Sequence, residues 1–241
     1  MAGNVEQHPQ GGRVALARQL GELARALRTE PNVQDTLDAI VRAAVDTVPG
    51  AWHAGISEVE RRQRTFRTSA ATGDLVYQVD QAQYDTGQGP CLDALCEHRT
   101  VLLPDIGTER RWPAFTARAA GLGVCSMLSF QLYVGRDSLG SLNLYASEAY
   151  AFTPESEQVG TLFAAHAAVA LADARKLAQL SQALGVRDVI GQAKGILMER
   201  HKVTGDEAFA LLVRASQGLN LKLIDVARYL VETGELVDRH R

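Results

Sequence analysis

Residues Val189–Leu230 read VIGQAKGILMERHKVTGDEAFALLVRASQGLNLKLIDVARYL, and this stretch decides the fold of the C-terminal part of the chain. Apolar residues recur in it every three or four positions, which is the period of an amphipathic helix. No segment alternates like a strand. The stretch therefore predicts a compact all-α bundle of three short helices over residues 187–236, with a short tail at 237–241.

The ends of these helices are marked by residues with known capping chemistry. Thr204 and Glu207 have the spacing of a capping box, in which each side chain binds a free backbone N–H of the other residue. Gly218 is expected to end the second helix and Asn220 to cap the third. Gly234 is expected to close the third helix, because glycine adopts the left-handed conformation at little cost.

A longer helix is predicted directly upstream, after the N-cap Thr153 and Pro154 at the first helical position. Small and apolar residues follow a 4-3 rhythm along it with little interruption. An ordinary helix that faces its own core would show a similar stripe. We interpret the stripe as a coiled-coil-like dimer seam, and residues 176–186 as a helical linker. The seam residues are Phe163, Ala167, Ala170, Ala174, Leu177 and Leu184.

Strand signals fill the middle of the chain. Cys125–Val134 and Leu139–Ala146 form the clearest hairpin, joined by the polar connection 135–138. Polar and apolar residues alternate along the first of these strands, as expected when one face is buried. Further strands are predicted at Ala51–Val59, Arg64–Ala70 and Thr100–Leu103, and the glycine-containing segment Thr72–Pro90 is predicted to be a loop.

Two helices are predicted before the first strand. An apolar stripe from Val33 to Val48 ends at Pro49-Gly50, and leucines at 16, 20, 23 and 27 mark a helix over residues 13–28. Residues 1–12 are predicted to be a disordered lead-in. The order of elements predicts an α+β domain over residues 13–175.

Composition limits the possible functions. The chain has 241 residues, 46% of them hydrophobic, and a formal net charge of −3, which disfavours non-specific coating of nucleic acid. It contains no run of about 18 apolar residues and no apolar signal core, so a cytoplasmic protein that does not enter membranes is expected. Three cysteines, Cys91, Cys96 and Cys125, fit reduced thiols better than a disulfide framework.

The C-terminal stretch resembles the ANTAR domain, the RNA-binding output module of bacterial antitermination regulators. The resemblance lies in Ala193, Gly195, Leu197-Met198, Asp206-Glu207-Ala208, Ala215-Ser216, Asn220 and Asp225-Val226-Ala227. It implies binding to paired RNA stem-loops, with dimerisation as the activating step.

The charges alone indicate RNA binding less strongly than the family resemblance does. Between Arg187 and Lys222, six basic residues face four acids, a surplus of two. Solvated helix faces would account for these charges equally well. Cations commonly anchor phosphates, while unpaired bases are read by stacking and hydrogen bonds. We predict RNA contacts at Lys194, Arg200, Arg214, Asn220 and Lys222.

Asn32–Ala172 resembles a GAF domain, which implies an antiparallel sheet with flanking helices and a sensor pocket closed by loops. The resemblance rests on the order of elements, on Tyr84–Leu92 (YDTGQGPCL) and on Leu139–Leu144 (LGSLNL). Such domains sense varied small molecules, so the fold names no ligand and the cofactor stays unknown. The residues predicted to line the pocket are Trp52, Phe66, Tyr84, Cys91, Phe130 and Tyr145.

Other chemistries have little support in the sequence. Cys91, Cys96 and His98 do not follow a known metal-ligand spacing, so no metal is predicted. Redox sensing or chromophore attachment at Cys91 stays open, beside the simpler interpretation of three reduced thiols. No catalytic motif is present, and we expect a regulator and not an enzyme. A signal in the GAF pocket would control RNA binding by a homodimer; the alternative is a signalling adaptor without direct RNA binding.

Overall fold

The computed structural model describes residues 18, 21–22, 24–27, 29–60, 65–97 and 100–236. The chain forms two compact units, residues 1–175 and 176–241. The predicted lead-in at 1–12 and the tail at 237–241 lie outside the described residues, as do Leu16, Leu20 and Leu23 of the first predicted helix. Within the described part, no helix is long and apolar enough to cross a bilayer.

The first unit is built on a five-stranded antiparallel sheet with the strand order β2-β1-β5-β4-β3. Its strands are β1 (His53–Glu60), β2 (Thr65–Ala71), β3 (Thr100–Leu103), β4 (Ser126–Val134) and β5 (Asp137–Ala146). The α+β prediction is confirmed. The hairpin turn is tighter than predicted, because Val134 pairs with Asp137 and only residues 135 and 136 connect the two strands.

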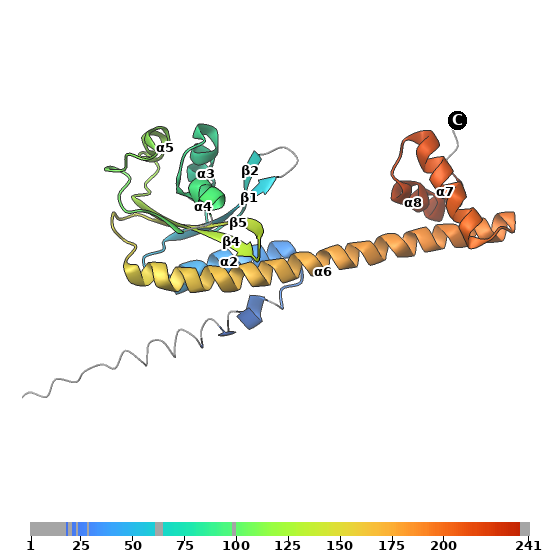
Figure 1. Cartoon of the computed structure of the whole chain (residues 1–241), viewed down its shortest axis with the longest axis horizontal. Coiled ribbons are helices and arrows are strands. Elements are labelled where there is room, and N and C mark those ends of the chain that lie inside the picture. Colours follow the sequence, from blue (N-terminus) through green and yellow to red (C-terminus); the bar gives the residue numbers. More distant parts are fainter. Residues whose placement is uncertain are drawn as a thin grey trace, which may run out of the picture. The chain divides into compact units, whose positions relative to one another are not determined.

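Helices cover both faces of this sheet (Figure 1). On one face lie α2 (Val33–Thr47) and the first part of α6 (Pro154–His201); on the other lie α3 (Asp74–Thr86), α4 (Pro90–Glu97) and α5 (Pro113–Ala119). The side chains facing α2 and α6 form the larger apolar core, which includes Ile56, Leu128 and Leu144.

The prediction of a loop over Thr72–Pro90 is wrong, since α3 and the start of α4 occupy it. The glycines stand at the ends of α3 and not within it: Gly73 is the N-cap and Gly87 is the left-handed C-cap. Val76, Val79 and Ala82 are buried at helical spacing. Glycines that mark helix ends therefore gave the segment the composition of a loop.

Helix α6 is continuous over 48 residues, from Pro154 to His201. Thr153 caps it as predicted, since its hydroxyl accepts from the backbone N–H of Ser156. The predicted dimer seam is wrong over its first half. Phe163, Ala167 and Ala170 are buried in the core of their own domain, and Ala174 is half-buried; only Leu177 and Leu184 are exposed.

The second unit contains the end of α6, α7 (Gly205–Leu219) and α8 (Leu223–Thr233) around a small core of Ala193, Leu197, Ala208, Leu212, Val226, Ala227 and Leu230. The Thr204–Glu207 capping box is confirmed. Gly218 lies inside α7 and does not end it. Asn220, with φ 54°, is the C-cap of α7, and Lys222 is the N-cap of α8, so the predicted cap assignments are corrected there.

Gly160 and Gly185 provide a matched test of packing on α6. A Cβ at Gly160 would lie 2.3 Å from the Phe130 ring, whereas a Cβ at Gly185 would meet nothing within 4 Å. Because Phe130 is buried, we expect Gly160→Ala to lower the free energy of unfolding by about 1–3 kcal/mol. Gly185→Ala should leave the first unit unchanged and raise helicity slightly. Urea unfolding followed by tryptophan fluorescence reports on the first unit, which contains Trp52 and Trp112. Equal stability of the two variants would contradict the contact.

Candidate functional site

A row of polar side chains lies on the face of the sheet that α3 and α4 cover. Along β5, Ser141, Asn143 and Tyr145 point to this face, and Leu142 and Leu144 point to the opposite core. Ser57 of β1 joins the polar row through its hydrogen bonds to Asn143 and α3. All of these polar residues are fully buried. Since helices cover both faces, the polar side of the alternation is an internal site and not a solvated surface.

Asp80 of α3 is the centre of this buried polar cluster. One carboxylate oxygen accepts from the Tyr145 hydroxyl and from Gln83 Nε2, at 3.1 Å for the latter. The other accepts from Thr68 Oγ1 at 2.7 Å and from Ser57 Oγ at 3.3 Å. All four donors are uncharged. The carboxylate is thus held by neutral dipoles alone in a fully buried site.

Burial sets the electrostatics of the cluster. It raises the pKa of Asp80 from 3.8 to about 6, against the lowering effect of the four hydrogen bonds, of which that from Tyr145 is the largest. Burial also raises the pKa of the Cys91 thiol to about 12, and the charge of Asp80 adds to this shift. The Cys91 thiol is therefore protonated and poorly nucleophilic, which disfavours redox sensing there.

Tyr84 and Cys91 connect the covering helices to the sheet. The Tyr84 hydroxyl donates to Ser57 Oγ at 2.7 Å, and Cys91 Sγ lies 3.1 Å from Ser141 Oγ. The Cys91 backbone N–H donates to Gln83 Oε1 at 3.0 Å, which joins α4 to α3. Gly89 permits this contact, because a Cβ there would lie 2.4 Å from the same amide oxygen.

Two buried atoms of the cluster region have no hydrogen-bond partner among the described residues: Ser129 Oγ and Asn143 Oδ1. Ser129 of β4 and Asn143 of β5 are directly paired across the sheet. An unsatisfied buried polar group costs about 1–3 kcal/mol, so these two atoms have unused hydrogen-bonding capacity on the cluster side of the sheet.

The structure brings together part of the predicted pocket. Tyr84, Cys91 and Tyr145 surround the cluster, and Phe66 stacks on Tyr84 with ring centroids 5.7 Å apart. The assignments of Phe130 and Trp52 to this pocket are wrong: Phe130 packs in the core on the opposite face, and Trp52 precedes β1 and is 47% exposed. Asp80, Ser57 and Asn143 were not among the predicted pocket residues. The alternation in Leu139–Ala146 was the available signal for the last of these.

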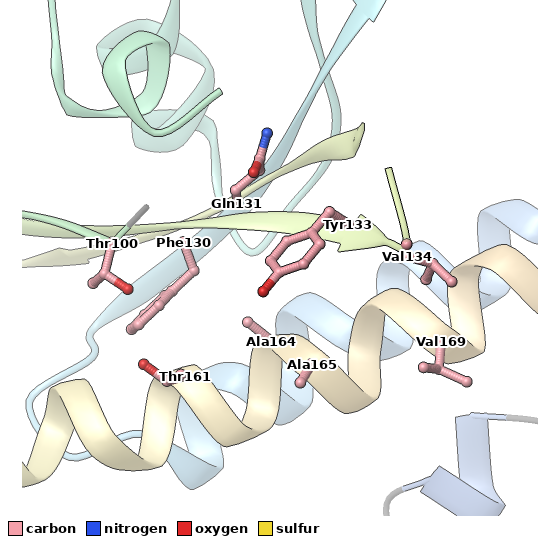
Figure 2. Close-up of a pocket in the computed structure, with 10 residues that line it drawn as sticks. Thr100, Phe130, Gln131, Tyr133, Val134, Thr161, Ala164, Ala165 and Val169 are labelled. Carbon is pink, nitrogen blue, oxygen red and sulfur yellow. The ribbon is translucent and has the colours of Figure 1, made fainter. Parts of the chain in front are cut away.

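Phe130 instead lies at an open groove between the β3–β4 edge and α6 (Figure 2). The groove has a volume of about 370 Å³. Its walls include Tyr133 and Val134 from the sheet and Ala165 and Val169 from α6. It is mainly apolar and lies away from the Asp80 cluster, on the other face of the sheet.

The predicted RNA contacts of the second unit are distributed over several elements. Lys194 lies beside the start of α7, with Nζ 3.5 Å from the position of a Cβ at Gly205, and Arg200 lies beside Gly234 at the end of α8. Arg214, Asn220 and Lys222 are exposed on α7 and in the α7–α8 turn.

These cations differ from Lys202 and Arg228 of the same unit in their ion pairing. Lys202 pairs with Glu199, and Arg228 lies 3.8 Å from Asp225. Lys194, Arg200, Arg214 and Lys222 pair with no carboxylate of the described residues. A cation without a protein partner is available to a phosphate.

Lys194 also approaches an aromatic side chain that the sequence analysis did not select. Its Nζ lies 6.0 Å from the centre of the Phe209 ring, which is 41% exposed. In the sequence of this unit, the Phe, Tyr and Trp residues are Phe209 and Tyr229, and neither belongs to its core.

Comparison with known families assigns both units. A GAF domain model matches residues 30–172 and an ANTAR domain model matches residues 178–231. The chain is a GAF–ANTAR protein. GAF domains are sensor domains, and the ANTAR family comprises RNA-binding antitermination regulators. Both domains are regulatory, which fits a protein that is not an enzyme. A search of curated proteins finds no match.

Solved structures share the fold at low sequence identity. The GAF domain of a phosphoenolpyruvate-protein phosphotransferase from Coxiella burnetii is 16% identical, covers 68% of this chain and 96% of its own, and has a TM-score of 0.53. A free methionine-R-sulfoxide reductase from Neisseria meningitidis is 14% identical over 67% of this chain and 91% of its own, with a TM-score of 0.54. A phytochrome photosensory core module from Stigmatella aurantiaca is 12% identical, covers 90% of this chain and 47% of its own, and has a TM-score of 0.61. The neighbours thus include an enzyme, and at these identities they show the fold alone.

The raised pKa of Asp80 predicts a specific pH dependence of stability. A carboxyl whose pKa is higher in the folded than in the unfolded state contributes to stability when it is protonated. For Asp80 this contribution is complete at pH values below 3.8, the pKa of the unfolded state, and it is lost as pH rises through about 6. The loss amounts to about 3 kcal/mol. Urea unfolding of wild type and Asp80→Asn across this range should show the dependence in the wild type and its absence from the variant. Asp85→Asn, which changes a half-exposed carboxylate of the same helix, is the control. A pH profile unaltered by Asp80→Asn would rule out the assignment.

Proposed function

We propose that this protein is a signal-responsive RNA-binding regulator that promotes transcription antitermination by binding paired RNA stem-loops as a dimer. The observation that carries the proposal is that the four cations predicted to contact RNA have no carboxylate partner among the described residues: Lys194, Arg200, Arg214 and Lys222. They supply anchors for phosphates, and Asn220 is exposed near Lys222 in the α7–α8 turn. The regulator would act in the cytoplasm, on nascent transcripts.

The sensor role is proposed for residues 13–175, with residues 176–186 as linker and 187–236 as output domain. The signal would be a small polar molecule at the Asp80 cluster, since Ser129 Oγ and Asn143 Oδ1 have unused hydrogen-bonding capacity there. Tyr84, Cys91 and Tyr145 are proposed as neighbours of this ligand and Phe66 as an outer support. Helix α6 contributes Phe163 to the sensor core and Leu197 to the output core, which gives a signal a continuous element to act on.

RNA binding by the unpaired cations can be measured directly. Lys194→Ala, Arg214→Ala and Lys222→Ala should each weaken binding and lower the slope of log affinity against log salt by about 1, because each removes one phosphate contact. Fluorescence anisotropy is measured with a library of RNAs that carry two hairpins separated by a variable spacer. Lys202→Ala and Arg228→Ala are matched controls, because these cations are already paired.

The same experiment separates this proposal from the adaptor alternative. If the wild type binds no RNA of the library above the level of an unstructured RNA, the protein acts through protein contacts instead. If all five variants weaken binding equally, RNA recognition does not depend on the unpaired cations, and the assigned RNA contacts are wrong.

A further inference from the structure

An exposed patch of the ANTAR unit lies where the end of α6 meets the first turns of α7. Met198 of α6 is 39% exposed, and Phe209 of α7 is exposed to a similar extent. Met198 Sδ lies 3.7 Å from the position of a Cβ at Gly205, where it meets the Lys194 side chain. Gly205 and Phe209 are four residues apart on α7, as Lys194 and Met198 are on α6, so each pair shares one helix face.

The two apolar side chains of this patch are not used by the domain's own core. Met198 and Phe209 follow the core residues Leu197 and Ala208 directly in sequence, and neither packs against the core. Consecutive side chains of a helix point in different directions, which turns both outward beside their buried neighbours. Neighbouring exposed apolar side chains indicate a binding surface more strongly than single scattered ones do.

Lys194 supplies the charge of the patch. Its Nζ lies 6.0 Å from the centre of the Phe209 ring, at the outer limit of a cation–π contact. The nearby acids of α7, Asp206 and Glu207, form no ion pair with it, and the Glu207 carboxylate is engaged in the capping box. The ammonium group is therefore available to an anion next to the ring.

An aromatic ring beside an unpaired cation fits a ligand that has both a flat face and an anionic group. A nucleotide of single-stranded RNA has both, since its base stacks on aromatic side chains and its phosphate pairs with cations. A phosphate contact alone would make no use of the exposed Phe209 ring. A purely apolar partner would cover the Lys194 ammonium and leave it without a counter-charge. The combination therefore favours an unpaired nucleotide.

We propose that Phe209 stacks on an unpaired base of an RNA hairpin loop, with Met198 at the edge of this platform and Lys194 on the adjoining phosphate. This contact rests on the proposed function and adds to it a residue that distinguishes loops from stems. Phosphate contacts position an RNA without reading its bases. A base that stacks on a protein ring must be free of its pairing partner, so Phe209 directs binding to the loop.

Fluorescence anisotropy of the full chain with the two-hairpin RNAs tests this contact. Phe209→Leu keeps an apolar side chain but removes the flat ring, and should weaken binding by about 5-fold or more. The slope of log affinity against log salt should stay unchanged, because no phosphate contact is lost. Phe209→Tyr keeps the ring and should bind like the wild type. Far-ultraviolet circular dichroism shows that the variants are folded.

Tyr229→Leu is the matched control for the loss of an exposed ring. Tyr229 of α8 is 43% exposed, and no cation of the described residues lies over its ring. Its replacement should leave the affinity for the same RNAs unchanged.

The RNA supplies a second measurement. An abasic nucleotide is placed at each loop position in turn, in both hairpins. At the position that Phe209 contacts, the wild type and Phe209→Leu should bind with equal affinity, because the stacked base is gone. At every other position the difference between the two proteins should remain.

Five outcomes would overturn the contact: Phe209→Leu binds like the wild type, Phe209→Leu lowers the salt slope by about 1, Phe209→Tyr binds as weakly as Phe209→Leu, Tyr229→Leu weakens binding equally, or no abasic position removes the difference. In each of them, wild-type RNA binding that responds to Lys194→Ala keeps the proposed function. A wild type that binds no RNA above the level of an unstructured RNA overturns both proposals, and the patch is then a surface for a protein partner.

Discussion

Both faces of the GAF sheet are covered by helices, and the architecture of the sensor domain follows from this constraint. A strand between two covered faces must send alternate side chains into two different interiors. The face toward α2 and α6 receives Ile56, Leu128 and Leu144 and forms an apolar core. The face toward α3 and α4 receives Ser57, Ser141 and Asn143, whose polar groups must then be satisfied without water.

Asp80 satisfies part of that requirement, since it accepts from the Ser57 hydroxyl, at an electrostatic cost. Its carboxylate accepts from four neutral donors and so connects β1, β2, β5 and α3. Burial without a cation leaves the charged form disfavoured, which is why its pKa is about 6 and not 3.8.

Helix α6 is a single element of secondary structure that contributes residues to the cores of both domains. Its inward residues complete the GAF core, and its last turns supply Ala193 and Leu197 to the small ANTAR core. That core is built from alanine, valine and leucine, with Phe209 and Tyr229 outside it. The domain therefore keeps both of these aromatic side chains partly exposed at its surface.

The sequence by itself determined all five strands, most of the long helices and some of the helix ends. Periodicity located α2, the β4–β5 hairpin and α6, and local capping chemistry identified Thr153 and the Thr204–Glu207 box, because these signals depend on residues close together in the chain. Sequence-based prediction failed at α3, where glycine caps resembled a loop, and at Asn220, which closes one helix instead of opening the next.

Only the tertiary structure decided which neighbour each apolar helix face or strand face packs against. Phe163 and Ala167 have the spacing of a seam but meet their own sheet, and Phe130 and Tyr145 lie on strands of one hairpin but on opposite faces. Asp80 could not be selected from the sequence, since its partners come from four separate segments. Local spacing fixes a helix face or a strand face, whereas the neighbour of that face is set by contacts between residues far apart in the chain.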